Sequence, residues 1–221
     1  MIVTIDGPAG TGKSTVARRL AEQLRFQFLD TGAMYRMIAL KALREQIDPG
    51  DQSGIGRLAR ETVMDLTDGG YLMDGVEVGG EIRTAEVTKA ASLVAQIPAV
   101  RELLVRRQRE IASARNIVCE GRDQGTVAFP HAECKFFLTA QPEERARRRL
   151  EELAAQGSQV DFEELLREQS DRDQRDQERA VAPLRPAADA LLVDTTALDL
   201  DQVVRLLREQ ILVRVQSAAA Q

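Results

Sequence analysis

A glycine-rich octapeptide near the start of the chain constrains the fold more than any other feature. The segment Gly7-Pro8-Ala9-Gly10-Thr11-Gly12-Lys13-Ser14 matches the pattern G-x-x-x-x-G-K-[ST] at every position. The apolar run Ile2–Ile5 precedes it, and an amphipathic helical pattern over 13–25 follows it. Glycines let backbone N–H groups turn inward around an oxyanion at the start of a helix. The sequence therefore predicts a strand, a phosphate-binding loop and a helix in succession.

Two side chains at the end of this loop carry the expected chemistry. Lys13 can reach the β- and γ-phosphates of a nucleoside triphosphate as a point charge, and the Ser14 hydroxyl can bind Mg²⁺. The motif predicts binding of a nucleoside triphosphate, but by itself it does not indicate what the energy is used for.

The rest of the chain alternates short apolar runs with longer helical patterns, which predicts an α/β fold. We expect a five-stranded parallel sheet covered by helices on both faces, with ligands at the carboxyl ends of its strands. Besides Ile2–Ile5, the predicted strands are 26–29, 116–119, 134–138 and 190–193. The predicted helices are 13–25, 33–46, 84–97, 99–113, 142–156, 161–179 and 199–216.

One region, about 62–83, breaks this alternation. Its short apolar runs are separated by Gly-rich turns such as Asp68-Gly69-Gly70 and Asp74-Gly75, which predicts a small antiparallel meander. The meander is either a module on the substrate side of the protein or structural decoration, and the sequence pattern favours neither.

Composition excludes several classes of protein. A chain of 221 residues suits one domain, and a net charge of −5 argues against binding to nucleic acid. No apolar stretch approaches membrane-spanning length and no signal peptide is evident, so we expect a cytoplasmic protein. Cys119 and Cys134 are expected to be buried, unreactive thiols, and the single His131 a surface residue.

Two turn-like segments follow predicted strands and carry polar side chains. In the first, Thr31 either caps a helix or binds a ligand, and Arg36 faces a phosphate or solvent. In the second, Arg122 can clamp a phosphate and Asp123 can accept from an amine or hydroxyl, although a structural ion pair is the alternative for both. Glu120 is placed to act as a carboxylate near Mg²⁺.

A charged helix near 171–179 places Arg172, Arg175, Asp176 and Arg179 at helical spacing on one face. An exposed helix with internal ion pairs is one interpretation. The other is a mobile lid, because phosphoryl transfer between two anions needs arginines that neutralise charge and exclude water.

These blocks together resemble the bacterial cytidylate kinases, a family of nucleoside monophosphate kinases. The similarity runs from about residue 2 to 215. It is carried by the phosphate loop and by the segments Asp30-Thr31-Gly32-Ala33-Met34-Tyr35-Arg36, Gly80-Glu81-Ile82-Arg83-Thr84, Glu120-Gly121-Arg122-Asp123, Arg172-Asp173-Gln174-Arg175-Asp176 and Arg179-Ala180-Val181-Ala182-Pro183-Leu184.

The resemblance implies Mg²⁺-dependent transfer from ATP to CMP or dCMP in pyrimidine nucleotide metabolism. A monomer is expected, because a small enzyme with internal lids can work alone. It also implies a single P-loop kinase domain with a core at about 1–35, 114–145 and 188–221, a monophosphate-binding region at about 36–113 and a helical lid at about 150–185. The implied site residues are Gly7, Pro8, Ala9, Gly10, Thr11, Gly12, Lys13, Ser14 and Thr15 for ATP, Ser14 and Glu120 for Mg²⁺, Thr31 and Asp176 for the ribose, Ser92, Arg101 and Asp123 for cytosine, Arg36, Arg122 and Arg179 for the monophosphate, and Arg172 and Arg175 from the lid.

Two alternatives stay open at this point. A kinase for dTMP or UMP would share the fold and the chemistry, although a uracil or thymine edge suits a pair such as Asp123 and Arg101 less well than cytosine. A P-loop module that binds ATP and signals through a partner would use the charged helix as a docking face.

Overall fold

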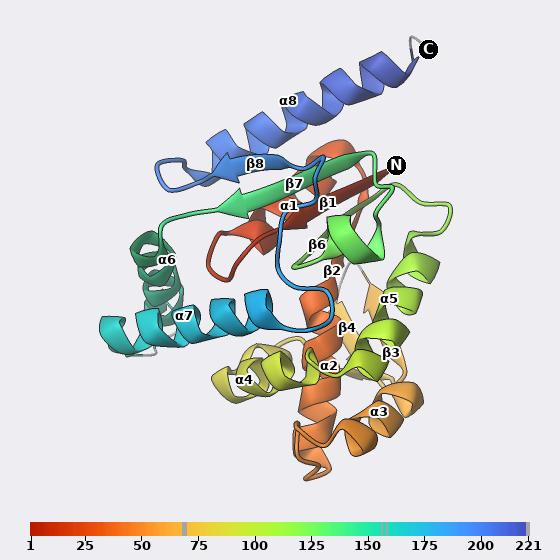
Figure 1. Cartoon of the computed structure of the whole chain (residues 1–221), viewed down its shortest axis with the longest axis vertical. Helices are drawn as coiled ribbons and strands as arrows, with labels where there is room; N and C mark the ends of the chain where they lie inside the picture. The colour runs from red at the N-terminus through yellow and green to blue at the C-terminus, as the bar shows by residue number, and fades with distance from the viewer. Residues whose placement is uncertain (68–69, 156, 158, 220–221) are drawn as a thin grey trace. The chain divides into compact units, whose positions relative to one another are not determined.

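The computed structural model of the protein forms two compact units (Figure 1). The first unit consists of residues 1–28 and 115–221, and the second of residues 29–114. The structure describes residues 1–67, 70–155, 157 and 159–219. The expected turn at 68–69, two positions of the predicted lid (156 and 158) and the last two of the predicted core (220–221) lie outside the described residues.

A five-stranded parallel sheet organises the first unit and confirms the predicted fold class. Its strand order is β2-β6-β1-β7-β8, and β1 pairs in parallel with β6 and β7. Asp6 at the end of β1 lies opposite Gly121 at the end of β6, so the loops after these two strands leave the sheet side by side. The strands are β1 (Ile2–Asp6), β2 (Gln27–Asp30), β6 (Ile117–Gly121), β7 (Cys134–Thr139) and β8 (Leu191–Asp194). The last two residues of β2 are assigned to the second unit.

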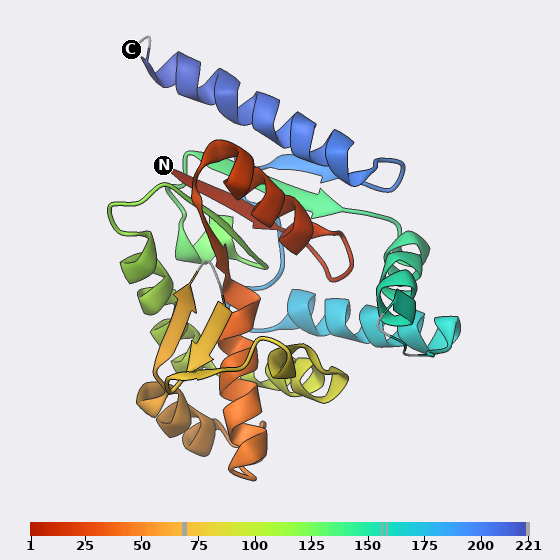
Figure 2. The same ribbon diagram turned by 180° about the vertical axis from the view of Figure 1, so that it is seen from behind.

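Among the described residues, this unit contains four α-helices and a short π-helix at Gln124–Ala128. Helices α1 (Lys13–Leu24) and α8 (Leu200–Ala219) contact each other and bury Leu20 and Leu207 in the same apolar core as the strands (Figure 2). Helices α6 (Pro142–Ala155) and α7 (Phe162–Glu178) pack against each other. All four were predicted within a few residues of their observed ends.

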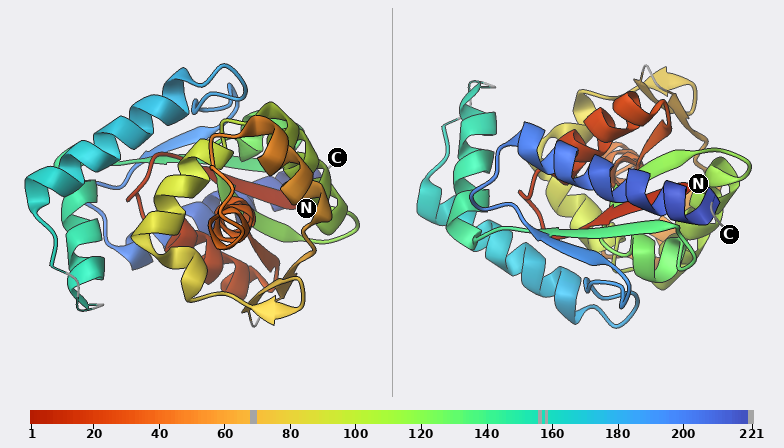
Figure 3. Two further views of the ribbon diagram at one scale, coloured as in Figure 1. Left: turned by 90° about the horizontal axis from the view of Figure 1, so that it is seen from below. Right: turned by 90° about the horizontal axis from the view of Figure 1, so that it is seen from above.

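In the second unit, helix α2 (Thr31–Arg44) packs against α3 (Gln52–Glu61), α4 (Ala85–Val94) and α5 (Pro98–Ala112). Figure 3 (left) looks nearly along α2, with these helices around it. Met34, Met37 and Ile38 of α2 are almost fully buried at the centre of this core.

The predicted meander is a three-stranded antiparallel sheet of β3 (Met64–Thr67), β4 (Gly70–Met73) and β5 (Val76–Glu77). Asp74 and Gly75 both take left-handed φ values, 51° and 81°, which the tight turn between β4 and β5 requires. A 3₁₀ turn at Glu81–Arg83 follows and leads into α4.

Helix α3 was not predicted. Gly54 and Gly56 lower its intrinsic helix propensity, but the Asp51 side chain caps its N-terminus, and Ile55 and Leu58 are buried against the core. Tertiary packing therefore outweighs local propensity in this segment.

Three smaller expectations can be compared with the structure. Both cysteines are buried, and burial raises the pKa of Cys119 and Cys134, which confirms two unreactive thiols. His131 is exposed, as expected. In the part of the chain that the structure describes, no helix is long and apolar enough to span a membrane.

Candidate active site

The phosphate loop has the backbone geometry that its glycines predict. Gly10 and Gly12 have φ values of 77° and 81°, in the left-handed region. At Gly7 a Cβ atom would collide with the carbonyl oxygen of Leu138 on the neighbouring strand, so only glycine fits there. Helix α1 begins at Lys13 directly after Gly12, which has no side chain to cap the helix. The first N–H groups of α1 therefore remain suited to an anion.

Lys13 is buried inside this loop, and its ammonium group donates to the carbonyl of Pro8 at 2.7 Å. Burial and, after it, the positive charge of Arg122 lower the pKa of Lys13 to about 7, although Glu120 acts in the opposite direction. A bound anion would stabilise the charged form of this buried lysine and raise its pKa again.

The two residues predicted to bind Mg²⁺ fit a hard cation. The hydroxyl of Ser14 donates to Oε1 of Glu120 at 2.9 Å, so one neutral and one anionic oxygen ligand lie together at the start of α1. No cluster of three histidine, cysteine or acidic residues that could hold a metal occurs among the described residues. The pair thus suits an ion that takes its remaining ligands from phosphate and water.

Asp6, which the sequence analysis did not single out, joins the two loops at this edge of the sheet. Its two carboxylate oxygens accept from the backbone N–H groups of Gln124 and Gly125, each at 2.8 Å. Burial raises the pKa of Asp6 to about 7, and the two hydrogen bonds oppose that shift without cancelling it. Asp6 therefore fixes the segment that follows Arg122 and Asp123 to the base of the phosphate loop.

Two of the predicted arginines of the first unit, Arg122 and Arg179, are paired with carboxylates. Arg122 Nε donates to Asp176 at 2.9 Å, and Arg179 Nη2 lies 3.4 Å from Asp123. Burial raises the pKa of Asp176, but the charges of Arg122, Arg172 and Arg179 outweigh burial and bring the pKa below its ordinary value. Three of the predicted arginines therefore act electrostatically on one carboxylate, and two of them, Arg122 and Arg172, also act on Lys13.

The inward face of α7 differs from the predicted one. Gln169, Asp173 and Asp176 are buried, whereas Arg175 is exposed. The buried residues of α7 are spaced i, i+4 and i+7 from Gln169, so they lie on one face of the helix. Arg175 lies at the edge of that face. The expectation that Arg175 shares a face with Asp176 is corrected accordingly.

Asp173 and Arg145 contact the phosphate loop itself, and sequence reasoning missed both. Asp173 accepts from the backbone N–H of Ala9 at 3.2 Å and forms an ion pair with Arg145. Arg145 also donates to the carbonyl of Ala9 at 2.9 Å. The spacing of Asp173 from Asp176, one helical turn, was the signal that could have identified it.

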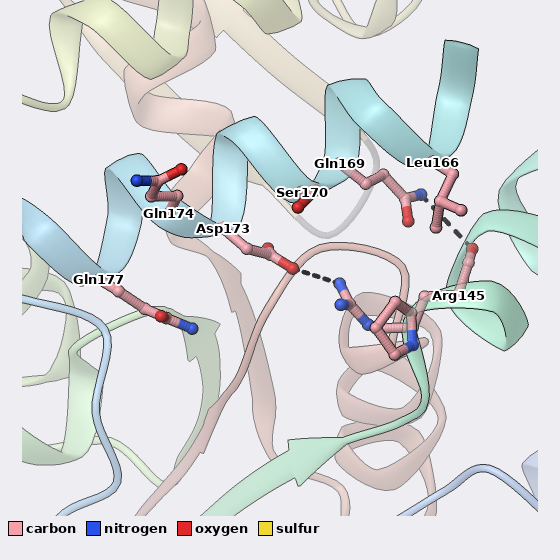
Figure 4. Close-up of a pocket in the computed structure, with 8 residues that line it drawn as sticks. Arg145, Leu166, Gln169, Ser170, Asp173, Gln174 and Gln177 are labelled. Atoms are coloured by element: carbon pink, nitrogen blue, oxygen red, sulfur yellow. Dashed lines mark hydrogen bonds and ion pairs between the residues drawn. The ribbon is translucent and has the colours of Figure 1, made fainter. Parts of the chain in front are cut away.

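A cavity of about 240 Å³ lies along α6 and α7 beside these contacts. Figure 4 shows Asp173 directed from α7 toward Arg145, with Gln169 one turn away. Gly10 of the phosphate loop approaches so closely that a Cβ there would lie 3.0 Å from the Arg145 carbonyl. Both helices are thus fitted directly onto the loop.

The other predicted site residues belong to the second unit. Thr31 is the first residue of α2, and Arg36 pairs with Asp30 at 3.0 Å. Arg101 lies over the ring of Tyr35, 5.8 Å from its centroid, and donates to the Ala95 carbonyl at 3.2 Å. The buried hydroxyl of Ser92 has no hydrogen-bond partner among the residues that the structure describes.

Comparison with solved structures identifies the fold. The fold is similar to that of a shikimate kinase from Bacteroides thetaiotaomicron (TM-score 0.51, 15% identity, 96% of this chain and 98% of that chain). It is also similar to a gluconokinase from Sinorhizobium meliloti (TM-score 0.52, 17% identity, 99% and 95%). At these identities the likeness concerns the fold, which is that of the P-loop kinases.

Sequence comparison identifies the family. The cytidylate kinase family profile matches residues 3–213. A cytidylate kinase from Pelotomaculum thermopropionicum is 54% identical over 210 residues, which cover 93% of each chain. One from Salmonella paratyphi B is 48% identical over 207 residues, covering 92% of this chain and 91% of the relative. The chain belongs to the cytidylate kinase family, and the resemblance inferred from the sequence is confirmed.

Proposed function

We propose that this protein transfers the γ-phosphoryl group of ATP to CMP or dCMP, yielding ADP and CDP or dCDP. An oxygen of the acceptor phosphate attacks the γ-phosphorus, and the bond to the β-phosphate oxygen breaks. The acceptor oxygen is already ionised, so no general base is needed. The observation that carries the proposal is the match of residues 3–213 to the cytidylate kinase family, and the site adds Lys13, buried in the phosphate loop with its ammonium group donating to the Pro8 carbonyl.

The first unit supplies the electrostatic part of this reaction. Lys13 would bind the β- and γ-phosphates, and Arg122 and Arg179 would exchange their carboxylate partners for phosphate oxygens. Mg²⁺, held through Ser14 and Glu120, would neutralise charge on the β- and γ-phosphates. The paired state seen in the structure keeps each guanidinium group oriented until an anion replaces its partner.

The remaining residues are assigned by family membership, one at a time. In this proposal residues 7–15 bind ATP, and the protein acts as a monomer in the cytoplasm, where these nucleotides are dissolved. The acceptor residues are Thr31 and Asp176 for the ribose, Ser92, Arg101 and Asp123 for cytosine, Arg36, Arg122 and Arg179 for the phosphate, and Arg172 and Arg175 for the transferring group.

Base recognition is supported by Ser92 and Arg101. Cytosine presents an exocyclic amine and a ring nitrogen that accepts a hydrogen bond, whereas uracil and thymine present an N–H at that ring position. The Ser92 hydroxyl, buried without a partner in the described part of the chain, is suited to such a polar edge. A base that mismatches buried polar groups is rejected because those groups lose their partners.

An ADP-release assay with CMP, dCMP, UMP and dTMP tests the proposal. We expect kcat/KM for the cytidine nucleotides to be at least about tenfold higher than for the others, because a mismatched base leaves at least one buried polar group without a hydrogen bond. Arg101→Ala should reduce this preference, whereas Arg106→Ala, an exposed arginine on the same helix, should leave it intact.

Two outcomes would contradict the proposal. Equal rates on all four nucleotides would refute the base assignments, and a preference for dTMP or UMP would indicate a different pyrimidine kinase. A protein that binds ATP but no free monophosphate in a calorimetric titration would instead be a regulatory module.

A further inference from the structure

The antiparallel insert brings two side chains to a buried carboxylate at the start of α2. Asp30 is 1% exposed, caps α2 by accepting from Ala33 N at 2.9 Å, and accepts from Arg36 Nη2 at 3.0 Å through both oxygens. Tyr71 of β4 donates its hydroxyl to Asp30 at 3.2 Å, and Arg83 of the 3₁₀ turn donates Nη2 at 3.3 Å. Two guanidinium groups therefore share one carboxylate.

The charges of this cluster do not balance. One carboxylate and two guanidinium groups leave a net charge of +1, counted over Asp30, Arg36 and Arg83. Arg36 already meets the need of Asp30 for a counterion, since both carboxylate oxygens lie 3.0 Å from it. The Arg83 side chain is 50% exposed, compared with 16% for Arg36, so Arg83 is the more accessible of the two arginines.

Arg83 is also held in place without a carboxylate of its own. Its Nη2 donates to the Tyr71 hydroxyl at 3.3 Å, and its guanidinium carbon lies 5.7 Å from the centroid of the Tyr71 ring. In the described structure Arg36 Nε is buried and has no hydrogen-bond partner. At Gly32 a Cβ would lie 3.0 Å from Arg36 Nη1, so the glycine lets that guanidinium group rest against the first turn of α2.

We propose that Arg83 is a second arginine for the acceptor's phosphate in this unit, acting with Arg36, and that Tyr71 positions it. This inference rests on the proposed function and deepens it. A phosphate monoester carries about −1.5 to −2 charges at pH 7 and three acceptor oxygens, which suits two guanidinium groups with a surplus positive charge. The insert would then take part in binding the acceptor, because Tyr71 lies on β4 and Arg83 in the 3₁₀ turn after β5.

Equilibrium binding of CMP and cytidine to Arg83→Ala and to the intact protein tests this role separately from turnover. We expect the affinity for CMP to fall about ten- to a hundredfold, the loss typical of a charge-assisted hydrogen bond. The affinity for cytidine, which lacks the phosphate, should stay within about twofold. Arg44→Ala is the matched control, because Arg44 lies in the same unit, is 41% exposed and pairs with Glu81 at 2.7 Å.

Tyr71→Phe tests the positioning residue. It keeps the ring under the guanidinium group but removes the hydroxyl that contacts Asp30 and Arg83. We expect the KM for CMP to rise about two- to fivefold with kcat unchanged, because the hydroxyl would act on the phosphate only by positioning Arg83. A fall in kcat with an unchanged KM would overturn the positioning role.

The outcomes separate this inference from the proposed function. If Arg83→Ala weakens CMP and cytidine equally, Arg83 serves only to neutralise Asp30 and the inference fails. If Arg83→Ala does not fold, Arg83→Gln keeps the side-chain length and must show the same selective loss. If the intact protein prefers another monophosphate, binding is measured for that nucleotide and its nucleoside instead. The inference then requires that Arg83→Ala weakens binding of the nucleotide but not of the nucleoside. A protein that binds no monophosphate would refute both.

Discussion

The two units of the molecule handle positive charge differently. In the first unit Arg122 and Arg179 each form an ion pair with a different carboxylate, Arg122 with Asp176 and Arg179 with Asp123. In the second unit Arg36 and Arg83 share Asp30. Paired charges keep side chains oriented but must be exchanged for the ligand, whereas a surplus charge attracts an anion directly. We therefore expect losses in the first unit to affect turnover more and those in the second to affect binding more.

The largest effect should come from Lys13→Ala. The lysine acts on phosphate charge rather than on packing, so we expect kcat to fall by about a thousandfold or more while the melting temperature stays close to that of the intact protein. Steady-state kinetics and thermal unfolding measure the two quantities. Lys89→Ala, which removes an exposed lysine, is the control. Retained turnover in Lys13→Ala would exclude this role.

Arg179→Ala should have the next largest effect. We expect a higher KM for CMP and a lower kcat, together a loss of about ten- to a hundredfold in kcat/KM, because one charge-assisted contact is removed. Arg167→Ala on the exposed side of α7 is the matched control. If only KM changed, Arg179 would act in binding alone, and the contrast between the two units would weaken.

The smallest effect concerns proton uptake when ATP binds. With a pKa of about 7, Lys13 is largely neutral at pH 8 before ATP binds. Phosphate oxygens favour the charged form and raise this pKa again, so binding should take up close to one proton at pH 8 and weaken as pH rises above 7. The other charges that act on Lys13 are Arg122 and Glu120 from β6 and its loop, and Arg172 and Asp173 from α7.

Calorimetry in buffers of different ionisation enthalpy measures this uptake. Lys13→Met should abolish it, whereas Lys89→Met should not. An uptake that persists in Lys13→Met would assign the proton to another group, of which Asp6, whose pKa burial raises to about 7, is the nearest candidate.

Helix α7 shows how far sequence reasoning reaches. The pattern correctly predicted a charged helix, but the choice of its inward face depends on which residues contact the phosphate loop. Asp173 is buried because Ala9 N and Arg145 lie opposite it, and neither neighbour is near it in sequence. Helix α3 was missed for a similar reason, since its two glycines disfavour a helix until Ile55 and Leu58 are buried.

The sequence by itself determined the phosphate loop, the strand and helix pattern, the antiparallel insert and the family. These features depend on local geometry: glycines at left-handed positions, apolar periodicity and turn residues act over a few neighbours along the chain. Only the tertiary structure decided which carboxylate faces which cation. Asp6, Asp173 and Asp30 gained their roles from burial and from partners distant in sequence, because the free energy of a charge depends on its surroundings in space.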